Sequence, residues 1–176
     1  LTAGQPRHDA QALRQRLRLP LPPERTVMVA FGGLGLSLDP ALLDRWPDHH
    51  FLVSESALAA AANATLIPPD LRPLELLPLC GRVITKPGYS TFCEALSRDV
   101  GIQLVQRHGF AEAPVLEADL QRHGWHRLLT RTQLEAGDWQ LDQPLLAPTA
   151  QPLPSGGEQA AALYLQRLAR THRATS

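Results

Sequence analysis

The residues best suited to bind a ligand fall in one short run, Thr85–Leu96, which reads TKPGYSTFCEAL. Gly88 allows a sharp turn after a predicted strand, and two hydroxyl side chains, Ser90 and Thr91, then begin a predicted helix. The free backbone N–H groups at a helix start can hold a phosphate. Lys86, the only lysine in the chain, stands at the end of the strand. The run therefore indicates an anion site.

Glu94 extends this run and leaves two interpretations open. Its carboxylate could accept hydrogen bonds from the hydroxyl groups of a ligand. Alternatively, Ser90 or Thr91 together with Glu94 forms an ordinary capped helix start, which local rules favour. The position of Lys86 at a strand end favours the ligand site.

A second candidate is the glycine cluster GGLG at 32–35, which follows a short apolar run at 26–31. Glycines let the backbone approach a ligand closely. The dinucleotide-binding pattern GxGxxG is not met, because Leu38 stands where Gly33 and Gly35 would require a third glycine. A tight turn before a helix explains the cluster equally well.

The third candidate is the loop QRHGFAEAP at 106–114. Arg107 and Glu112 are well placed there to contact a polar ligand such as a sugar. A solvated connection, with Glu112 and Pro114 starting the next helix, is the other interpretation.

The elements that would position these loops are short apolar strands alternating with helices. Strands are predicted at 26–31, 50–53, 65–67, 82–85, 102–106 and 127–130. This alternation predicts an α/β fold with a doubly wound, mostly parallel, six-stranded Rossmann-like sheet. In such folds a ligand binds beyond the carboxyl ends of the strands, where all three loops would lie.

The chain divides into four parts by composition. We expect an N-terminal helix and proline-rich lead-in at 1–24, the Rossmann-like domain at 25–141, a proline-rich linker at 142–157 and a C-terminal amphipathic helix at 158–176. Since the chain starts at Leu1, we expect a fragment of a longer protein.

Charge and composition exclude several classes of function. Seventeen Lys and Arg balance seventeen Asp and Glu, which disfavours nucleic acid as a partner. No apolar stretch approaches the length of a transmembrane segment. Two cysteines form no disulfide framework, so a cytoplasmic location is expected, and the spacing of the seven histidines does not favour a metal site.

The order of the GGLG turn and the KPGYSTFCEAL run about fifty residues later resembles the C-terminal, donor-binding half of GT-B-fold glycosyltransferases. The closest likeness is to the glycosyltransferase-like region of plant L-arabinokinases, which shares a Gly-x-Trp ending, here Gly137–Trp139. The likeness covers roughly residues 25–140.

The resemblance implies a role for individual residues. Gly88, Ser90 and Thr91 match the helix start that holds the diphosphate of the donor, and Glu94 matches the carboxylate that binds ribose. Gly33 and Gly35 match the loop facing the interdomain cleft, and Glu112 the acidic position near the donor sugar. With the two basic residues identified above, the predicted ligand-binding set is Gly33, Gly35, Lys86, Gly88, Ser90, Thr91, Glu94, Arg107 and Glu112.

The function so implied is binding of a nucleotide-diphosphate sugar, UDP-sugar by the habit of the family, for transfer to an acceptor. No cofactor and no metal are expected. Such enzymes need a second Rossmann-like domain, expected here upstream, so this chain alone should be inactive and no catalytic residue is assigned. Two alternatives remain: a noncatalytic nucleotide-sugar-binding or regulatory module, and an epimerase of the same fold.

Overall fold

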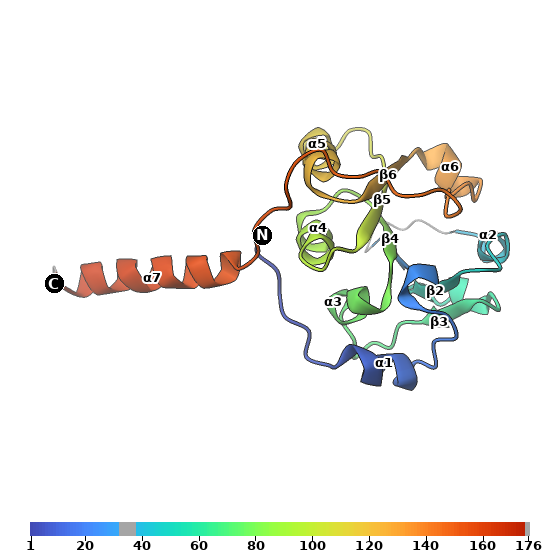
Figure 1. Cartoon of the computed structure of the whole chain (residues 1–176), viewed down its shortest axis with the longest axis horizontal. Helices are drawn as coiled ribbons and strands as arrows, with labels where there is room; N and C mark the ends of the chain where they lie inside the picture. The colour runs from blue at the N-terminus through green and yellow to red at the C-terminus, as the bar shows by residue number, and fades with distance from the viewer. Residues whose placement is uncertain (32–37, 175–176) are drawn as a thin grey trace.

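A computed structural model describes residues 1–31 and 38–174 of the chain (Figure 1). These residues form one six-stranded parallel sheet with the order β3-β2-β1-β4-β5-β6. The strands are β1 (Thr26–Ala30), β2 (His50–Val53), β3 (Ala64–Leu66), β4 (Arg82–Thr85), β5 (Gly101–Val105) and β6 (His126–Leu129). The predicted doubly wound α/β fold is confirmed.

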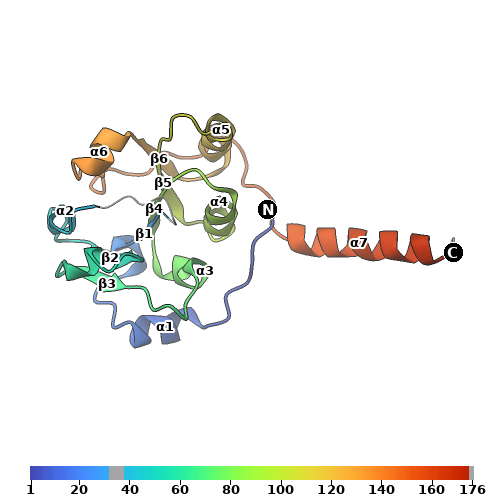
Figure 2. The ribbon, with the colours of Figure 1, turned by 180° about the vertical axis from the view of Figure 1, so that it is seen from behind.

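Helices cover both faces of the sheet (Figures 1 and 2). The α-helices are α1 (Ala10–Arg16), α2 (Ala41–Asp44), α3 (Pro73–Leu76), α4 (Tyr89–Leu96), α5 (Ala113–His123), α6 (Arg131–Glu135) and α7 (Gly157–Ala174). Short 3₁₀ turns are η1 (Pro23–Arg25), η2 (Leu58–Ala60) and η3 (Leu77–Leu79). In both views α1, α3, α4 and α5 lie on one face, whereas α2 and α6 lie on the other.

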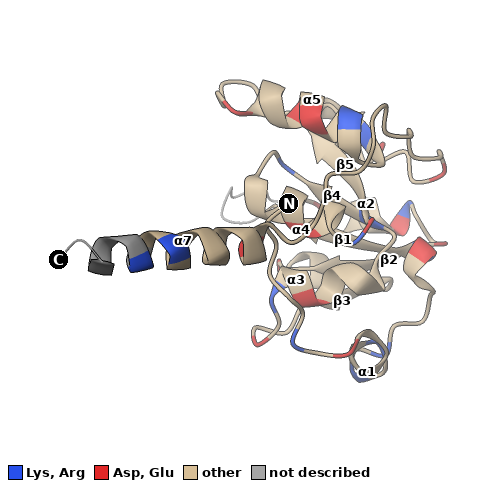
Figure 3. Cartoon of the chain, turned by 60° about the vertical axis from the view of Figure 1, so that its left-hand side comes forward, with Lys and Arg blue, Asp and Glu red and all other residues tan. Residues whose placement is uncertain are grey.

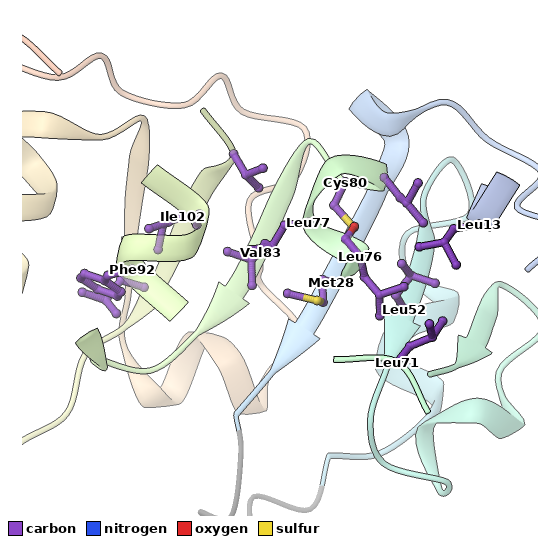
Figure 4. Close-up of a cluster of buried hydrophobic side chains, with 14 of the residues drawn as sticks. Leu13, Met28, Leu52, Leu71, Leu76, Leu77, Cys80, Val83, Phe92 and Ile102 are labelled. Atoms are coloured by element: carbon purple, nitrogen blue, oxygen red, sulfur yellow. The ribbon is translucent and has the colours of Figure 1, made fainter. Parts of the chain in front are cut away.

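The four central strands, β2, β1, β4 and β5, are mostly apolar because side chains on both of their faces are buried. On β1, Met28 points into a core with α1, α3, α4 and α5, which Figure 4 shows around Leu76 and Phe92. Its neighbours Val27 and Val29 point into the opposite core, which contains Trp139. Alternate residues of a strand thus serve two separate cores.

The direction of winding reverses between β1 and β4, which are hydrogen-bonded neighbours in the middle of the sheet. From β1 the chain builds outward through β2 to β3, then returns to β4 and builds outward through β5 to β6. The connections leaving β1 and β4 therefore diverge. In folds of this type such a reversal opens a crevice beyond the carboxyl ends of the two strands.

The sequence did not predict α6, although its start carries a clear signal. Thr130 accepts a hydrogen bond from the backbone N–H of Gln133, and the Gln133 side chain accepts one from the Thr130 N–H. This capping box ends β6 and begins a helix within one residue. A Thr-x-x-Gln pattern directly after a strand could have revealed it.

The predicted linker at 142–157 is attached to the sheet over part of its length. Leu146 forms an antiparallel bridge with His126 on edge strand β6, and Ala150 donates to the carbonyl of Arg122. Beyond this stretch, α7 projects away from the domain (Figure 1). The helix begins beside the start of the chain, where the N–H of Gly157 donates to the carbonyl of Leu1 at 2.8 Å. In the described residues no helix combines the length and apolarity needed to span a membrane.

Candidate functional site

A pocket of about 300 Å³ opens at the carboxyl ends of β1 and β4, where the strand order reverses. It is lined by residues from the ends of both strands and from the starts of α3 and α4: Ala30, Phe31, Pro73, Thr85, Lys86, Gly88, Tyr89, Ser90 and Thr91. Four of the predicted ligand-binding residues, namely Lys86, Gly88, Ser90 and Thr91, therefore share one pocket.

The floor of the pocket is fixed by a bond between the two strands. Thr85, the last residue of β4, is buried, and its hydroxyl donates to the carbonyl of Ala30, the last residue of β1, at 2.7 Å. This side-chain hydrogen bond adds to the parallel pairing of β1 with β4, in which Ala30 and Thr85 are register partners. The loops that diverge from the two strands consequently start from a rigid base.

The start of α4 presents to this pocket backbone donors that have no partner within the described part of the chain. Gly88 caps the helix in an extended conformation, and no side chain caps it within the described residues. The first intrahelical bond runs from the N–H of Phe92 to the carbonyl of Gly88 at 3.1 Å. The N–H groups of Tyr89, Ser90 and Thr91 precede that bond and have no acceptor within the helix. Such a helix start favours an anion.

The alternative interpretation of this run as a capping box is wrong. A capping residue must lie just before the helix, but Ser90 and Thr91 lie inside its first turn. Glu94 is the sixth residue of α4, too far along to reach the cap. Among the described residues, none of these three polar side chains caps the helix.

Glu94 lies one helical turn beyond Ser90 on the same face of α4, outside the residues that line the pocket. Its side chain is half-buried, and no hydrogen bond to its carboxylate occurs within the described residues. Partial burial raises the pKa of Glu94, against the opposing effect of Arg98 and Arg72. The carboxylate is therefore partly desolvated and accepts no hydrogen bond from the described residues.

Lys86 is half-buried in the pocket wall and forms no ion pair with the described residues. Tyr89 is 54% exposed at the same place and offers an aromatic face beside the helix start. The sequence alone predicts no site role for Tyr89, Phe31 or Pro73. Tyr89 directly follows the glycine that caps α4, so the sequence could have indicated it. Phe31 and Pro73 reach the pocket only through the tertiary structure.

Three of the other predicted residues, Glu94, Arg107 and Glu112, do not line this pocket. Gly33 and Gly35 lie outside the described residues. Arg107 and Glu112 follow β5, and both are exposed and absent from the pocket lining. The Arg107 guanidinium stacks on the ring of Phe110 at 4.9 Å, so it is engaged within its own loop.

Among the described residues no group of three or more His, Cys, Asp or Glu side chains could hold a metal ion. Comparison with known proteins gives no family model that matches the chain, and no match among curated proteins.

Proposed function

We propose that this domain binds a nucleotide-diphosphate sugar, UDP-sugar by preference, and is the donor-binding half of a glycosyltransferase. The observation that carries the proposal is the pocket at the reversal of strand order, which combines the open start of α4 with the chain's single lysine. An anionic ligand there would meet backbone N–H groups, a helix dipole and one ammonium group.

The spacing along α4 fits the parts of such a ligand. The diphosphate would accept hydrogen bonds from the N–H groups of Ser90 and Thr91, with Lys86 as a counter-charge. Glu94, one turn or about 5.4 Å further along the helix axis, would accept hydrogen bonds from ribose hydroxyls. A diphosphate and its ribose span a comparable length, so both contacts can form at once. Arg107 and Glu112 would reach the donor sugar only if their loop moved toward the pocket.

A second, upstream Rossmann-like domain would supply the acceptor site. Support comes from α7, which carries an exposed apolar stripe at helical spacing: Ala161, Tyr164, Leu165 and Leu168. The side chains of Tyr164 and Leu165 are each 63% exposed. Exposed apolar side chains that form one continuous stripe are usually covered by another protein surface. Because α7 begins beside Leu1, a domain preceding Leu1 would lie close to this helix.

The proposal is tested by calorimetric titration of the domain with UDP, GDP, ADP and their common sugar conjugates. We expect saturable binding of one nucleotide, much weaker binding of its nucleoside, and at least a tenfold loss of affinity in Lys86→Ala, because one charge-assisted contact contributes about 1.5–3 kcal/mol. An Arg16→Ala variant, on α1 and outside the pocket lining, should bind normally. If the nucleoside binds as well as the diphosphate, the proposed phosphate site at α4 is wrong.

The alternatives share the binding step and differ in product. An epimerase would convert the sugar of the nucleotide sugar without an acceptor, and a noncatalytic module would leave it unchanged. Incubating the full-length natural protein with the nucleotide sugar identified by titration, followed by analysis of the sugar products, separates the three functions.

A further inference from the structure

A second and larger pocket, of about 490 Å³, lies at the opposite edge of the sheet, where the strands begin. Its lining includes Arg25, just before β1, His49, just before β2, and Arg82, the first residue of β4. Arg45 and Trp46, which follow α2, complete one side. Parallel strands bring their amino ends to one edge, so side chains distant in the sequence meet here. Figure 3 shows charged segments of both signs near α2 and the adjoining strands.

The arginine charges in this pocket are poorly neutralised. Nη2 of Arg82 donates to the carbonyl of Gln143 at 2.9 Å, whereas its Nη1 is buried and has no partner among the described residues. Arg45 donates to the carbonyl of Ala136. Neither guanidinium forms an ion pair with a described carboxylate. Carbonyl groups satisfy hydrogen-bond donors but do not cancel a full positive charge.

The pKa of His49 indicates which charge predominates at the pocket wall. Its side chain is buried, with 8% of the residue exposed, and its Nδ1 has no hydrogen-bond partner among the described residues. Burial lowers the pKa of His49 most, and Arg25 and Arg82 lower it further. Asp48 and Asp142 raise it by less. The positive charges therefore outweigh the negative ones at this position.

The carboxylates of the pocket lie at its exposed rim. Glu24, Asp48 and Asp142 are all exposed, and the Asp48 side chain is 83% accessible to solvent. Asp48 approaches Arg25 at only 3.8 Å, a distance at which an exposed pair is weak. Water screens these acidic groups far more than it screens the half-buried Arg82. The inner wall thus remains basic.

We propose that this pocket binds a small molecule through an oxyanion, either a phosphate or a carboxylate, with Arg82 as the principal contact and Arg25 and His49 beside it. A guanidinium presents paired donors that match either oxyanion. The site is on the opposite edge from the proposed nucleotide pocket, and it does not depend on that function.

The test is NMR titration of the folded chain with inorganic phosphate and, separately, with malonate, each against sodium chloride at equal ionic strength. The backbone amide and imidazole signals of His49 are monitored. We expect saturable shifts with one of the two anions in the millimolar range, an affinity typical of a small ion. The stronger anion identifies the ligand as phosphate-bearing or carboxylate-bearing.

Three variants assign the binding site. Arg82→Gln should weaken the binding at least tenfold, and Arg25→Gln, whose side chain is about half exposed, should weaken it measurably even if Arg82→Gln does not fold. Arg16→Gln, on α1 and outside the lining of both pockets, is the control and should leave the shifts of the His49 signals unchanged. Saturation of the His49 shifts with neither anion would overturn the proposal. Binding that survives in both Arg25→Gln and Arg82→Gln would also overturn it.

Discussion

Two carboxylates on neighbouring helices, Glu75 on α3 and Glu94 on α4, have opposite surroundings. Glu75 is buried and fully bonded: it accepts hydrogen bonds from the Arg72 guanidinium and from the backbone N–H of Arg7 and His8. These bonds hold the N-terminal lead-in against α3. Glu94 accepts none within the described residues. A structural role is therefore expected for Glu75, and a binding role for Glu94.

Glu94→Ala should weaken binding of the nucleotide diphosphate by about 1.5–3 kcal/mol, because a charge-assisted contact to ribose is lost. Its melting temperature should stay within about 2 °C, since alanine suits a helix and no bond is broken. Calorimetry and a thermal scan measure both quantities, with Glu135→Ala on exposed α6 as the control. A large fall in stability with unchanged affinity would make Glu94 a structural residue.

Glu75→Gln should lower the free energy of unfolding by about 2 kcal/mol at pH 7. Burial opposes ionisation of Glu75, but the hydrogen bonds from Arg72, Arg7 and His8 prevail and lower its pKa from 4.5 to about 2. The folded pKa is depressed, so this stabilisation is complete above pH 4.5 and is lost as the pH falls toward 2.

Denaturant unfolding of both proteins at pH 7, 5 and 3 measures this dependence. The difference between the unmodified chain and Glu75→Gln should shrink from pH 5 to pH 3. The control Glu135→Gln removes only the exposed pair with Arg131 and should change little at any pH. A difference that does not vary with pH would contradict the pKa assignment.

At the scale of elements, the segment after α6 closes one core of the domain. Trp139 is fully buried, its indole N–H donates to the carbonyl of Leu134 at 2.9 Å, and its ring packs edge-on against Phe51. The buried side chain of Gln103, in the middle of β5, donates to the carbonyl of Trp139. The Gly-x-Trp ending noted in the sequence therefore has a packing role.

Gly137 makes the turn into this segment, and substituting it should be costly. Its φ of +71° lies in the left-handed region, and an added Cβ would come within 3.1–3.2 Å of Leu42 and Arg45. Gly109 has a similar φ of +75° with nothing within 4 Å. Gly109→Ala should therefore cost only the backbone strain, about 1–2 kcal/mol.

Gly137→Ala should cost this strain plus the crowding, so its free energy of unfolding should fall below that of Gly109→Ala. Chemical denaturation of the two variants gives the comparison directly. Equal losses would show that the neighbouring side chains yield without cost.

At the scale of the whole molecule, α7 contributes little to the stability of the domain. Shortening the chain after Gln159 should leave the melting temperature within about 2 °C, because the exposed side chains of Leu163, Tyr164 and Leu165 lose no core contacts. Leu120→Ala, in the core, should cost about 2–5 kcal/mol. Thermal scans followed by circular dichroism test this, and a marked loss of stability on shortening would mean that α7 packs against the domain.

The sequence by itself determined the class of fold and the position of most elements. Each strand is a short apolar run between turn residues, which is a local signal. Both β2 and β4 were therefore predicted with their observed ends, and each of the other four strands is shifted by at most one residue at either end. A helix after Gly88 was also visible, since helix starts depend on neighbouring residues. Its cap was not, because local rules indicated Ser90 or Thr91 and the structure has Gly88.

Only the tertiary structure decided which of the candidate loops meet. The pairing of β1 with β4 puts Ala30 and Phe31 beside Lys86 and the start of α4, while Arg107 remains bound within its own loop. The basic pocket at the amino edge was invisible in the sequence for the same reason. Its arginines are spread over some sixty positions, and strand order, which no local pattern encodes, brings them together.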